Sequence, residues 1–240
     1  MKKGAMLYQG KAKQVFATDD SDKVIMVFSD DATAFDGAKK GQIGNKGVIN
    51  CTVSRHLFTL LETYGIPTHL IDCPAKNEML VKKVSIIPVE VVIRNIAAGS
   101  ICRRLGVEEG MRLKHPIYEF FYKNDELHDP LITEEHIRVF DWATPEEMVF
   151  MRETAFKVND ILFAAMDKVG ITLVDYKLEF GRTADGKVVL ADEITPDGCR
   201  LWDKQTGKKL DKDRFRRDLG GVEEAYSEAE TRLLSIPIPA

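Results

Sequence analysis

The residues best suited to chemistry lie between positions 173 and 200, and charged and apolar side chains alternate in the first part of this stretch, residues 174–180. Successive side chains of an extended strand point to opposite faces, so residues of odd and even number should separate. The expected ionic face holds Leu173, Asp175, Lys177 and Glu179, and the expected apolar face holds Val174, Tyr176, Leu178 and Phe180. Such a strand could present two carboxylates and an ammonium group to one ligand.

A returning strand from Lys187 to Glu193 should bring further carboxylates to this face. The dipeptide Asp185-Gly186 is a strong signal for a two-residue hairpin loop. A two-residue loop would set Glu179 directly opposite Asp192. A three-residue loop would shift the pairing by one residue and place Glu179 opposite Ala191.

Two carboxylates that face each other need a partner, because like charges directly opposite on antiparallel strands repel. A hard cation that takes oxygen ligands from both Glu179 and Asp192 would remove this repulsion. Mg²⁺ is the expected ion, since it typically uses one or two carboxylates together with substrate phosphates. The alternative is a solvated acidic face on which Lys177 neutralises one carboxylate.

Two other stretches could bind phosphate groups. The turn Gly10-Lys11-Ala12-Lys13 lies within a predicted β-meander over residues 6–30, and its amides and ammonium groups could hold phosphate oxygens. An ordinary hairpin tip is the alternative. The strand Ile86–Arg94 leads into a short helix at Ser100, where a helix N-terminus and a guanidinium could bind phosphate. Ser100 could equally be a plain N-cap and Arg94 part of a surface ion pair.

The remaining elements must position these stretches. Helical spacing of apolar residues predicts helices over residues 48–64, 145–169 and 222–234. The second begins at a capping box, Thr144-Pro145-Glu146-Glu147, and ends at Gly170. Strands are predicted over residues 67–71, 79–84 and 118–123, a polar loop over residues 31–40, and a solvated helix start over residues 208–218.

The composition is that of a soluble globular protein. The chain has 240 residues, of which 44% are hydrophobic and 30% charged, and its net charge is −4. Without a basic stripe, a nucleic-acid partner is not expected. The four cysteines show no metal-binding spacing, which suggests reduced thiols in the cytoplasm. The absence of a long apolar run predicts a protein that neither crosses a membrane nor is exported.

The motifs at residues 86–100 and 173–181 resemble the two signature motifs of the SAICAR synthetase family, and shorter matches occur at residues 8–13, 129–130, 196–203 and 211–216. The resemblance implies an ATP-dependent ligase of de novo purine synthesis. It would join the carboxylate of carboxyaminoimidazole ribonucleotide (CAIR) to the amino group of L-aspartate through an acyl phosphate, releasing ADP and phosphate. The implied fold is α+β, with antiparallel sheets, lobes at residues 1–84 and 85–240, ATP between the lobes, and a homodimer as the common assembly.

The resemblance also implies roles for individual residues. Those expected at ATP are Lys11, Ala12, Lys13, Val15, Val81 and Lys82, and those expected at the substrates are Arg94, Ser100, Asp175, Lys177, Arg200 and Asp36. Glu179 and Asp192 match the Mg²⁺ positions, and Lys11, Lys13 and Lys177 are the candidate catalytic residues. The family often has a serine where this chain has Cys199, so the resemblance implies the neighbouring arginine but not a serine hydrogen bond. Asp36 belongs to the loop 31–40, the candidate site for L-aspartate.

Two other functions fit part of the pattern. A small-molecule kinase of related fold would also use ATP and Mg²⁺, but would need a hydroxyl acceptor and a general base. The motif from Arg94 to Ser100 favours the ligase, because it resembles a ribonucleotide phosphate site. A regulatory protein that binds nucleotide without turnover would be expected to have lost a metal carboxylate or a phosphate lysine, and both kinds are present.

Overall fold

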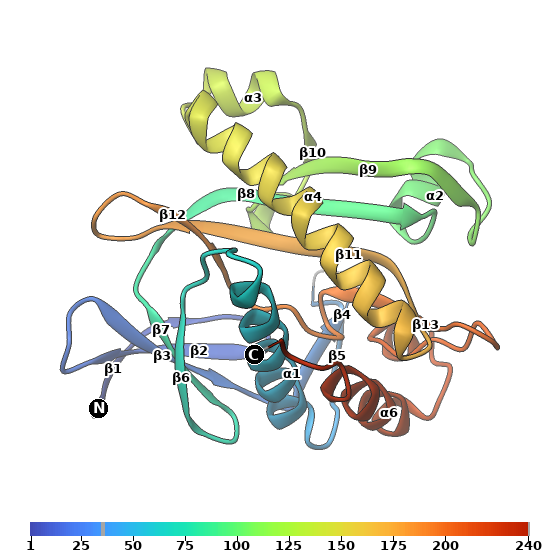
Figure 1. The fold of residues 1–240 in the computed structure, drawn as a ribbon, viewed down its shortest axis with the longest axis horizontal. Coiled ribbons are helices and arrows are strands. Elements are labelled where there is room, and N and C mark those ends of the chain that lie inside the picture. The colour runs from blue at the N-terminus through green and yellow to red at the C-terminus, as the bar shows by residue number, and fades with distance from the viewer. Residues whose placement is uncertain (35–36, 240) are drawn as a thin grey trace.

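Two antiparallel sheets form the framework of the protein, and helices pack against them (Figure 1). The computed structural model describes residues 1–34 and 37–239. The N-terminal sheet has the strand order β1-β2-β3-β7-β6, and the central sheet has the order β10-β9-β8-β11-β12, with β13 also paired to β11. The predicted α+β fold with antiparallel sheets is confirmed.

The N-terminal sheet consists of β1 (Lys3–Gln9), β2 (Lys13–Thr18), β3 (Lys23–Phe28), β6 (Leu70–Ala75) and β7 (Glu78–Lys82). Its first three strands confirm the predicted meander, in which polar turns separate short apolar runs. The strand expected from Pro67 begins instead at Leu70. Strands β4 (Asp31–Ala34) and β5 (Lys39–Gln42) pair with each other in the stretch expected to be a loop.

The central sheet consists of β8 (Ser85–Ile96), β9 (Arg112–Tyr122), β10 (Leu131–Ile132), β11 (Ile171–Arg182), β12 (Val188–Ala191) and β13 (Cys199–Asp203). The chain passes from one sheet to the other between Lys82 and Ser85, where the lobe boundary was placed. One hydrophobic core nevertheless includes residues of both sheets, such as Met26 and Val89. The division into two lobes therefore stays a prediction.

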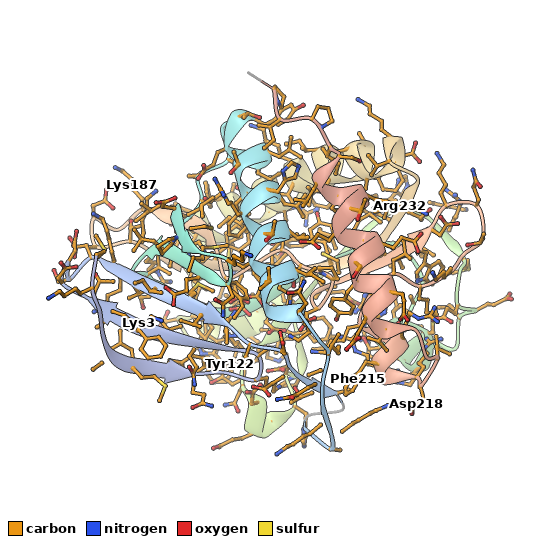
Figure 2. The ribbon with its side chains drawn as sticks, turned by 90° about the horizontal axis from the view of Figure 1, so that it is seen from below. Lys3, Tyr122, Lys187, Phe215, Asp218 and Arg232 are labelled. Atoms are coloured by element: carbon orange, nitrogen blue, oxygen red, sulfur yellow. The ribbon has the colours of Figure 1, made fainter. Side chains whose placement is uncertain are left out.

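The long helices cover the sheets. Helix α1 (Lys46–Thr63) packs on β3, β6 and β7, and α6 (Val222–Leu234) lies beside α1 (Figure 2). Helix α4 (Pro145–Lys168) packs on β8 and β11, and its predicted capping box and Gly170 stop are confirmed. The short helices are α2 (Ser100–Leu105), α3 (Glu134–Val139), α5 (Asp213–Arg216) and the 3₁₀ turn η1 (Asp125–Leu127). None of the described helices is both long and apolar enough to cross a membrane.

The β11–β12 hairpin differs from the two-residue loop by one residue in register. Glu179 pairs with Ala191 and not with Asp192. Gly186, with φ of 80°, donates its amide hydrogen to the carbonyl oxygen of Thr183 over 2.9 Å, so the loop is a turn followed by a left-handed residue. The prediction of directly opposed carboxylates was therefore wrong, and the three-residue alternative is the observed one.

Strand β11 also departs from strict alternation. A bulge opposite β13 lies between Leu173 and Asp175. Leu173 consequently belongs to the main core, whereas Val174 packs in a small separate cluster beside Trp202. Placing Leu173 on the ionic face and Val174 on the main apolar face was wrong.

Candidate active site

Two adjoining cavities lie where the N-terminal sheet meets the central sheet. The polar cavity has a volume of about 430 Å³ and is lined largely by charged side chains and backbone. The apolar cavity has a volume of about 390 Å³ and is lined mainly by aliphatic residues. Both cavities share the residues Tyr8, Lys13, Lys123, Glu179 and Asp192. A ligand with an apolar ring and a charged tail could therefore occupy both.

The apolar cavity has walls from β2, β3 and β7. Val15 and Val81, both predicted at ATP, line it. Lys82 does not, because side chains alternate along β7 and its ammonium group instead donates to the carbonyl oxygen of Thr68 over 3.0 Å. The neighbouring Lys83 lines the cavity in its place. The side chain of Lys82 thus points away from the apolar cavity, and its place at ATP stays a prediction.

The turn between β1 and β2 lines the polar cavity with Lys11, Ala12 and Lys13, as expected for a phosphate-binding turn. Lys11 Nζ donates to Asp125 Oδ1 over 2.8 Å, so the turn is linked to the 3₁₀ segment η1 on the other side of the cavity. Lys13 Nζ forms ion pairs with both Asp192 and Glu193. Lys11 and Lys13 thus bring positive charge to the polar cavity, which Asp192 and Glu193 also line.

Glu179 is buried on β11 and is held by two lysines. Lys123 Nζ donates to Glu179 Oε1 over 2.8 Å, and Lys177 forms a second ion pair with the same oxygen. Lys177 also contacts Glu90 Oε1 over 2.8 Å, and Glu90 is the residue opposite Glu179 on β8. Burial alone would raise the pKa of Glu179, but Lys177, Lys123 and Lys13 hold it well below its usual range. Glu179 is therefore an anion, not a solvated acidic side chain.

Asp192 follows the end of β12 and has a left-handed backbone with φ of 60°. This conformation costs a non-glycine residue on the order of 1–3 kcal/mol, and such residues cluster at functional sites. It directs the Asp192 carboxylate to Lys13 and into both cavities. Although the strands do not pair Glu179 with Asp192, the cavities bring the two carboxylates to one ligand-binding space.

The two carboxylates suit a hard cation. Among the described residues, no group of three or more acidic, histidine or cysteine side chains forms a preformed metal cage. Mg²⁺ does not require such a cage, since it usually binds one or two carboxylates with substrate phosphates and water. Glu179 and Asp192, both ionic and both facing the polar cavity, fit that donor set.

A second charged cluster lies farther along β8 and β11. Arg94 is buried, and its Nη1 donates to Asp175 Oδ2 over 2.6 Å while its Nη2 donates to Ser100 Oγ over 3.1 Å. Arg200 Nη1 donates to the same Asp175 oxygen over 2.9 Å. Four predicted substrate residues are thus brought together, but none is among the described residues that line the polar or apolar cavity.

The local geometry of this cluster corrects one expectation. Ser100 is the first residue of α2 and not its N-cap, which is Gly99. A side chain at Gly99 would collide with the Arg200 guanidinium, so glycine there lets Arg200 approach the backbone closely. Arg94 is not part of a surface ion pair, because its side chain is almost fully enclosed. Cys199 is also buried, which raises the pKa of its thiol.

A third charged cluster was missed from the sequence. Lys46 has no exposed surface, and its Nζ lies 3.0 Å from Asp197 Oδ2. Tyr226 donates its hydroxyl hydrogen to Asp197 Oδ1 over 2.6 Å, and Lys212 Nζ lies 3.4 Å from Asp197 Oδ2. Burial would raise the pKa of Asp197, but Lys212 and Lys46 hold it well below its usual range. The glycine-flanked Asp197 turn was visible in the sequence, but its partners were not.

The charged run 208–218 is not simply solvated, which contradicts the prediction. Asp211, Lys212 and Asp213 are buried, because they pair with groups from other parts of the chain. Lys212 and Arg216 line the polar cavity near Thr33, Ala34 and Gly37. The predicted substrate residue Asp36 lies outside the described residues.

Comparisons with known proteins agree with one another. A family model described as SAICAR synthetase matches residues 6–233. A phosphoribosylaminoimidazole-succinocarboxamide synthase from Magnetococcus marinus is 57% identical over 240 residues, spanning 99% of each chain. A crystal structure of the enzyme of that name from Ehrlichia chaffeensis has a TM-score of 0.94 at 47% identity and covers 97% of this chain and 100% of its own. A SAICAR synthetase solved in complex with ADP has a TM-score of 0.92 at 48% identity and covers 98% and 100%.

Proposed function

Because the chain belongs to the SAICAR synthetase family of ATP-dependent ligases of purine biosynthesis, we propose that it joins the carboxylate of CAIR to the amino group of L-aspartate, releasing ADP and phosphate. The observation that carries this proposal is the junction of the two cavities at Lys13, Glu179 and Asp192. The apolar cavity could hold a nucleobase, and at the junction it meets the ammonium group of Lys13 and the carboxylates of Glu179 and Asp192. No observation favours a kinase or a regulatory protein.

The apolar cavity is the proposed site of the adenine ring. Its aliphatic side chains, including Val15 and Val81, could pack against the faces of a purine ring. The polar cavity would then take the phosphates, with Lys11 and Lys13 beside them and the backbone at Ala12 close by. The relative that was solved with ADP supports a nucleotide at this family site.

Glu179 and Asp192 are the proposed holders of Mg²⁺. When bound, the ion would neutralise phosphate charge during phosphoryl transfer. Lys13 now pairs with Asp192, and it would be available to the transferred phosphoryl group once a cation occupied the carboxylates. Lys177 forms ion pairs with both Glu179 and Glu90 and so keeps Glu179 ionised. It lies on β11 between Glu179 and the residues proposed to bind the substrate.

The Arg94 and Arg200 cluster is the proposed site for the ribonucleotide phosphate. Ser100 and the two guanidinium groups supply donors to phosphate oxygens, and Asp175 holds both arginines in place. Asp175 and Lys177 follow each other on the ionic side of β11, where they are proposed to contact the ribose and the rest of the substrate. The substrate would therefore run along β11 from the arginines toward Glu179.

The amino-acid subsite is proposed where Lys212 and Arg216 line the polar cavity together with residues of the segment 31–40. A dicarboxylate needs cations, and the acidic Asp36 of that segment could not bind one unaided. Lys212 and Arg216 line the same cavity as Thr33 and Gly37, which flank that residue in sequence. Lys212 and Arg216 thus bring positive charge to the part of the polar cavity that this segment lines.

The proposed chemistry activates a poor acyl donor. An oxygen of the CAIR carboxylate attacks the γ-phosphorus of ATP, the bond to ADP breaks, and an acyl phosphate forms. The amine of L-aspartate then attacks the acyl carbon, the carbon–oxygen bond to phosphate breaks, and the amine loses its proton. Lys11, Lys13 and Lys177 act by charge stabilisation and positioning, which phosphoryl transfer mainly requires. No enzyme nucleophile takes part.

An isotope experiment tests this chemistry. CAIR carrying ¹⁸O in its carboxylate is incubated with the enzyme, ATP, Mg²⁺ and L-aspartate, and the phosphate released is examined by mass spectrometry. One labelled oxygen per phosphate is the expected result, and unlabelled phosphate would contradict the acyl phosphate. The homodimer and the cytoplasmic location expected from the sequence remain predictions, which sedimentation and cell fractionation would test.

A further inference from the structure

His69 is buried behind the candidate metal carboxylate and contacts the backbone that carries it. Its Nε2 lies 3.0 Å from the carbonyl oxygen of Asp192. Its ring packs edge-on against Phe58, with centroids 5.6 Å apart, and only 2% of the residue is exposed. The residue also lines the apolar cavity. It therefore lies between the proposed base site and the backbone of Asp192.

The chemistry of this contact fixes the ring tautomer. A carbonyl oxygen can only accept, so Nε2 must carry the hydrogen and donate it. A neutral ring that donates through Nε2 leaves Nδ1 as an acceptor only.

The backbone around His69 is tied to two strands. Its amide hydrogen is donated to the carbonyl oxygen of Leu190 over 2.9 Å, and Leu190 donates its own amide hydrogen to Pro67 over 3.0 Å. Lys82 in β7 donates its amide hydrogen to the carbonyl oxygen of His69 over 2.7 Å. The backbone of His69 is thus fixed by β7 and β12 through bonds that do not involve Asp192 itself.

Asp192 needs such support, because it leaves β12 in the left-handed conformation that non-glycine residues adopt only at a cost. We propose that His69 is a positioning residue, whose Nε2–H holds the carbonyl of Asp192 and thereby aims the Asp192 carboxylate at the two cavities. The inference rests on the proposed Mg²⁺ role of Asp192. His69 does not touch the reacting atoms and acts through the carboxylate it positions.

Three variants test the proposal. His69→Leu replaces the ring with an apolar side chain that cannot donate. His69→Gln retains an N–H donor at about the same distance from the backbone as Nε2. His56→Leu is the matched control, since His56 Nε2 also lies 2.9 Å from a backbone carbonyl, that of Ile236, but lines neither cavity. Mn²⁺ binding to each protein in the presence of ADP is measured by electron paramagnetic resonance, and kcat is measured over a Mg²⁺ titration.

His69→Leu is expected to weaken Mn²⁺ binding by about 10- to 100-fold, as loss of a group that orients a metal ligand typically does. The KM for L-aspartate should stay within about twofold of the wild type, because its proposed subsite is elsewhere. His69→Gln should recover most of the lost affinity, and His56→Leu should bind Mn²⁺ like the wild type. Wild-type Mn²⁺ affinity in His69→Leu would overturn the proposal.

Asp192→Asn separates this proposal from the metal assignment on which it rests. Wild-type Mn²⁺ affinity in Asp192→Asn would show that the assignment itself fails. Lost affinity in Asp192→Asn together with unchanged affinity in His69→Leu would overturn only the positioning role. If His69→Leu does not fold, ¹⁵N spectra of the histidine rings in the wild-type protein decide, since a His69 ring without a proton on Nε2 would contradict the inferred contact.

Discussion

Glu179 and Asp192 line the same two cavities, although they are not opposite each other in the β11–β12 hairpin. Asp192 reaches these cavities from a left-handed backbone that follows β12, and not through strand pairing with Glu179. Each carboxylate already has lysine partners: Asp192 pairs with Lys13 of β2, and Glu179 pairs with Lys177 of β11 and with Lys123, which follows β9. The site therefore holds its negative charges in place before any ligand arrives.

The two carboxylates should be needed for turnover. Glu179→Gln is expected to lower kcat by about 100-fold or more, because loss of a group aimed at developing charge commonly costs that much. Stability should fall only modestly, since Lys123 and Lys177 can still reach solvent. Steady-state kinetics and thermal unfolding measure both effects. Glu78→Gln, which breaks a peripheral ion pair with Lys3, is the control, and a near-normal rate in Glu179→Gln would refute the metal assignment.

Arg94, which is buried, should contribute to the stability of the fold as well as to binding of the ribonucleotide. Arg94→Ala removes one of the two arginine partners of Asp175 and of Glu119, and breaking a buried pair can cost up to about 3–5 kcal/mol. Arg200→Lys is the better probe, because it keeps the charge but loses the planar fork. We expect Arg200→Lys to raise the KM for the ribonucleotide by about tenfold and to change the KM for ATP little. An unchanged ribonucleotide KM in a folded Arg200→Lys would remove Arg200 from that site.

The proposed amino-acid subsite can be tested with two neighbouring arginines. Arg216 lines the polar cavity, whereas Arg217 pairs with Glu109 outside it. Arg216→Gln should raise the KM for L-aspartate by about tenfold, the cost of one good charged contact. Arg217→Gln should leave that KM unchanged. Equal effects from both substitutions would mean that general surface charge, and not a subsite, is responsible.

Asp211 should give the protein a pH-dependent stability. The residue is buried, and burial followed by the nearby Asp213 carboxylate raises its pKa to about 7. The folded state thus holds a proton that the unfolded chain releases near pH 4. This stabilisation is complete below about pH 4, declines as pH rises, and is lost above about pH 7.

Asp211→Asn cannot titrate, so its stability should change less between pH 5 and pH 7. The difference in slope should be at most about 1.4 kcal/mol per pH unit, the linkage value for one proton. Urea unfolding at several pH values measures it. Parallel pH profiles for the two proteins would show that Asp211 is ionised throughout this range.

Local elements could be read from the sequence because their signals are local. The capping box at Thr144 and the stop at Gly170 fix α4, and the bounds of α6 match those expected from its apolar spacing. The hairpin register could not be read, since Asp185-Gly186 suits both a two-residue and a three-residue loop. The pairing of Glu179 with Ala191 and the bond from Gly186 to Thr183 show which loop forms.

Residues of the site could be predicted from the sequence only where they belong to a recognisable motif. Lys13, Glu179 and Asp192 do meet at the cavities, as expected. Lys46 and His69 were missed, because their importance depends on Asp197 and Asp192, which are far away in the chain. A buried lysine and a surface lysine look alike in one sequence, so tertiary partners must be seen to tell them apart.

The most direct measurement is ADP release from ATP and Mg²⁺ with CAIR, run with and without L-aspartate. The account predicts sustained release only when both substrates are present, with one succinocarboxamide product formed for each ADP. Sustained release that is indifferent to L-aspartate would contradict the ligase reaction, and so would nucleotide binding without any release.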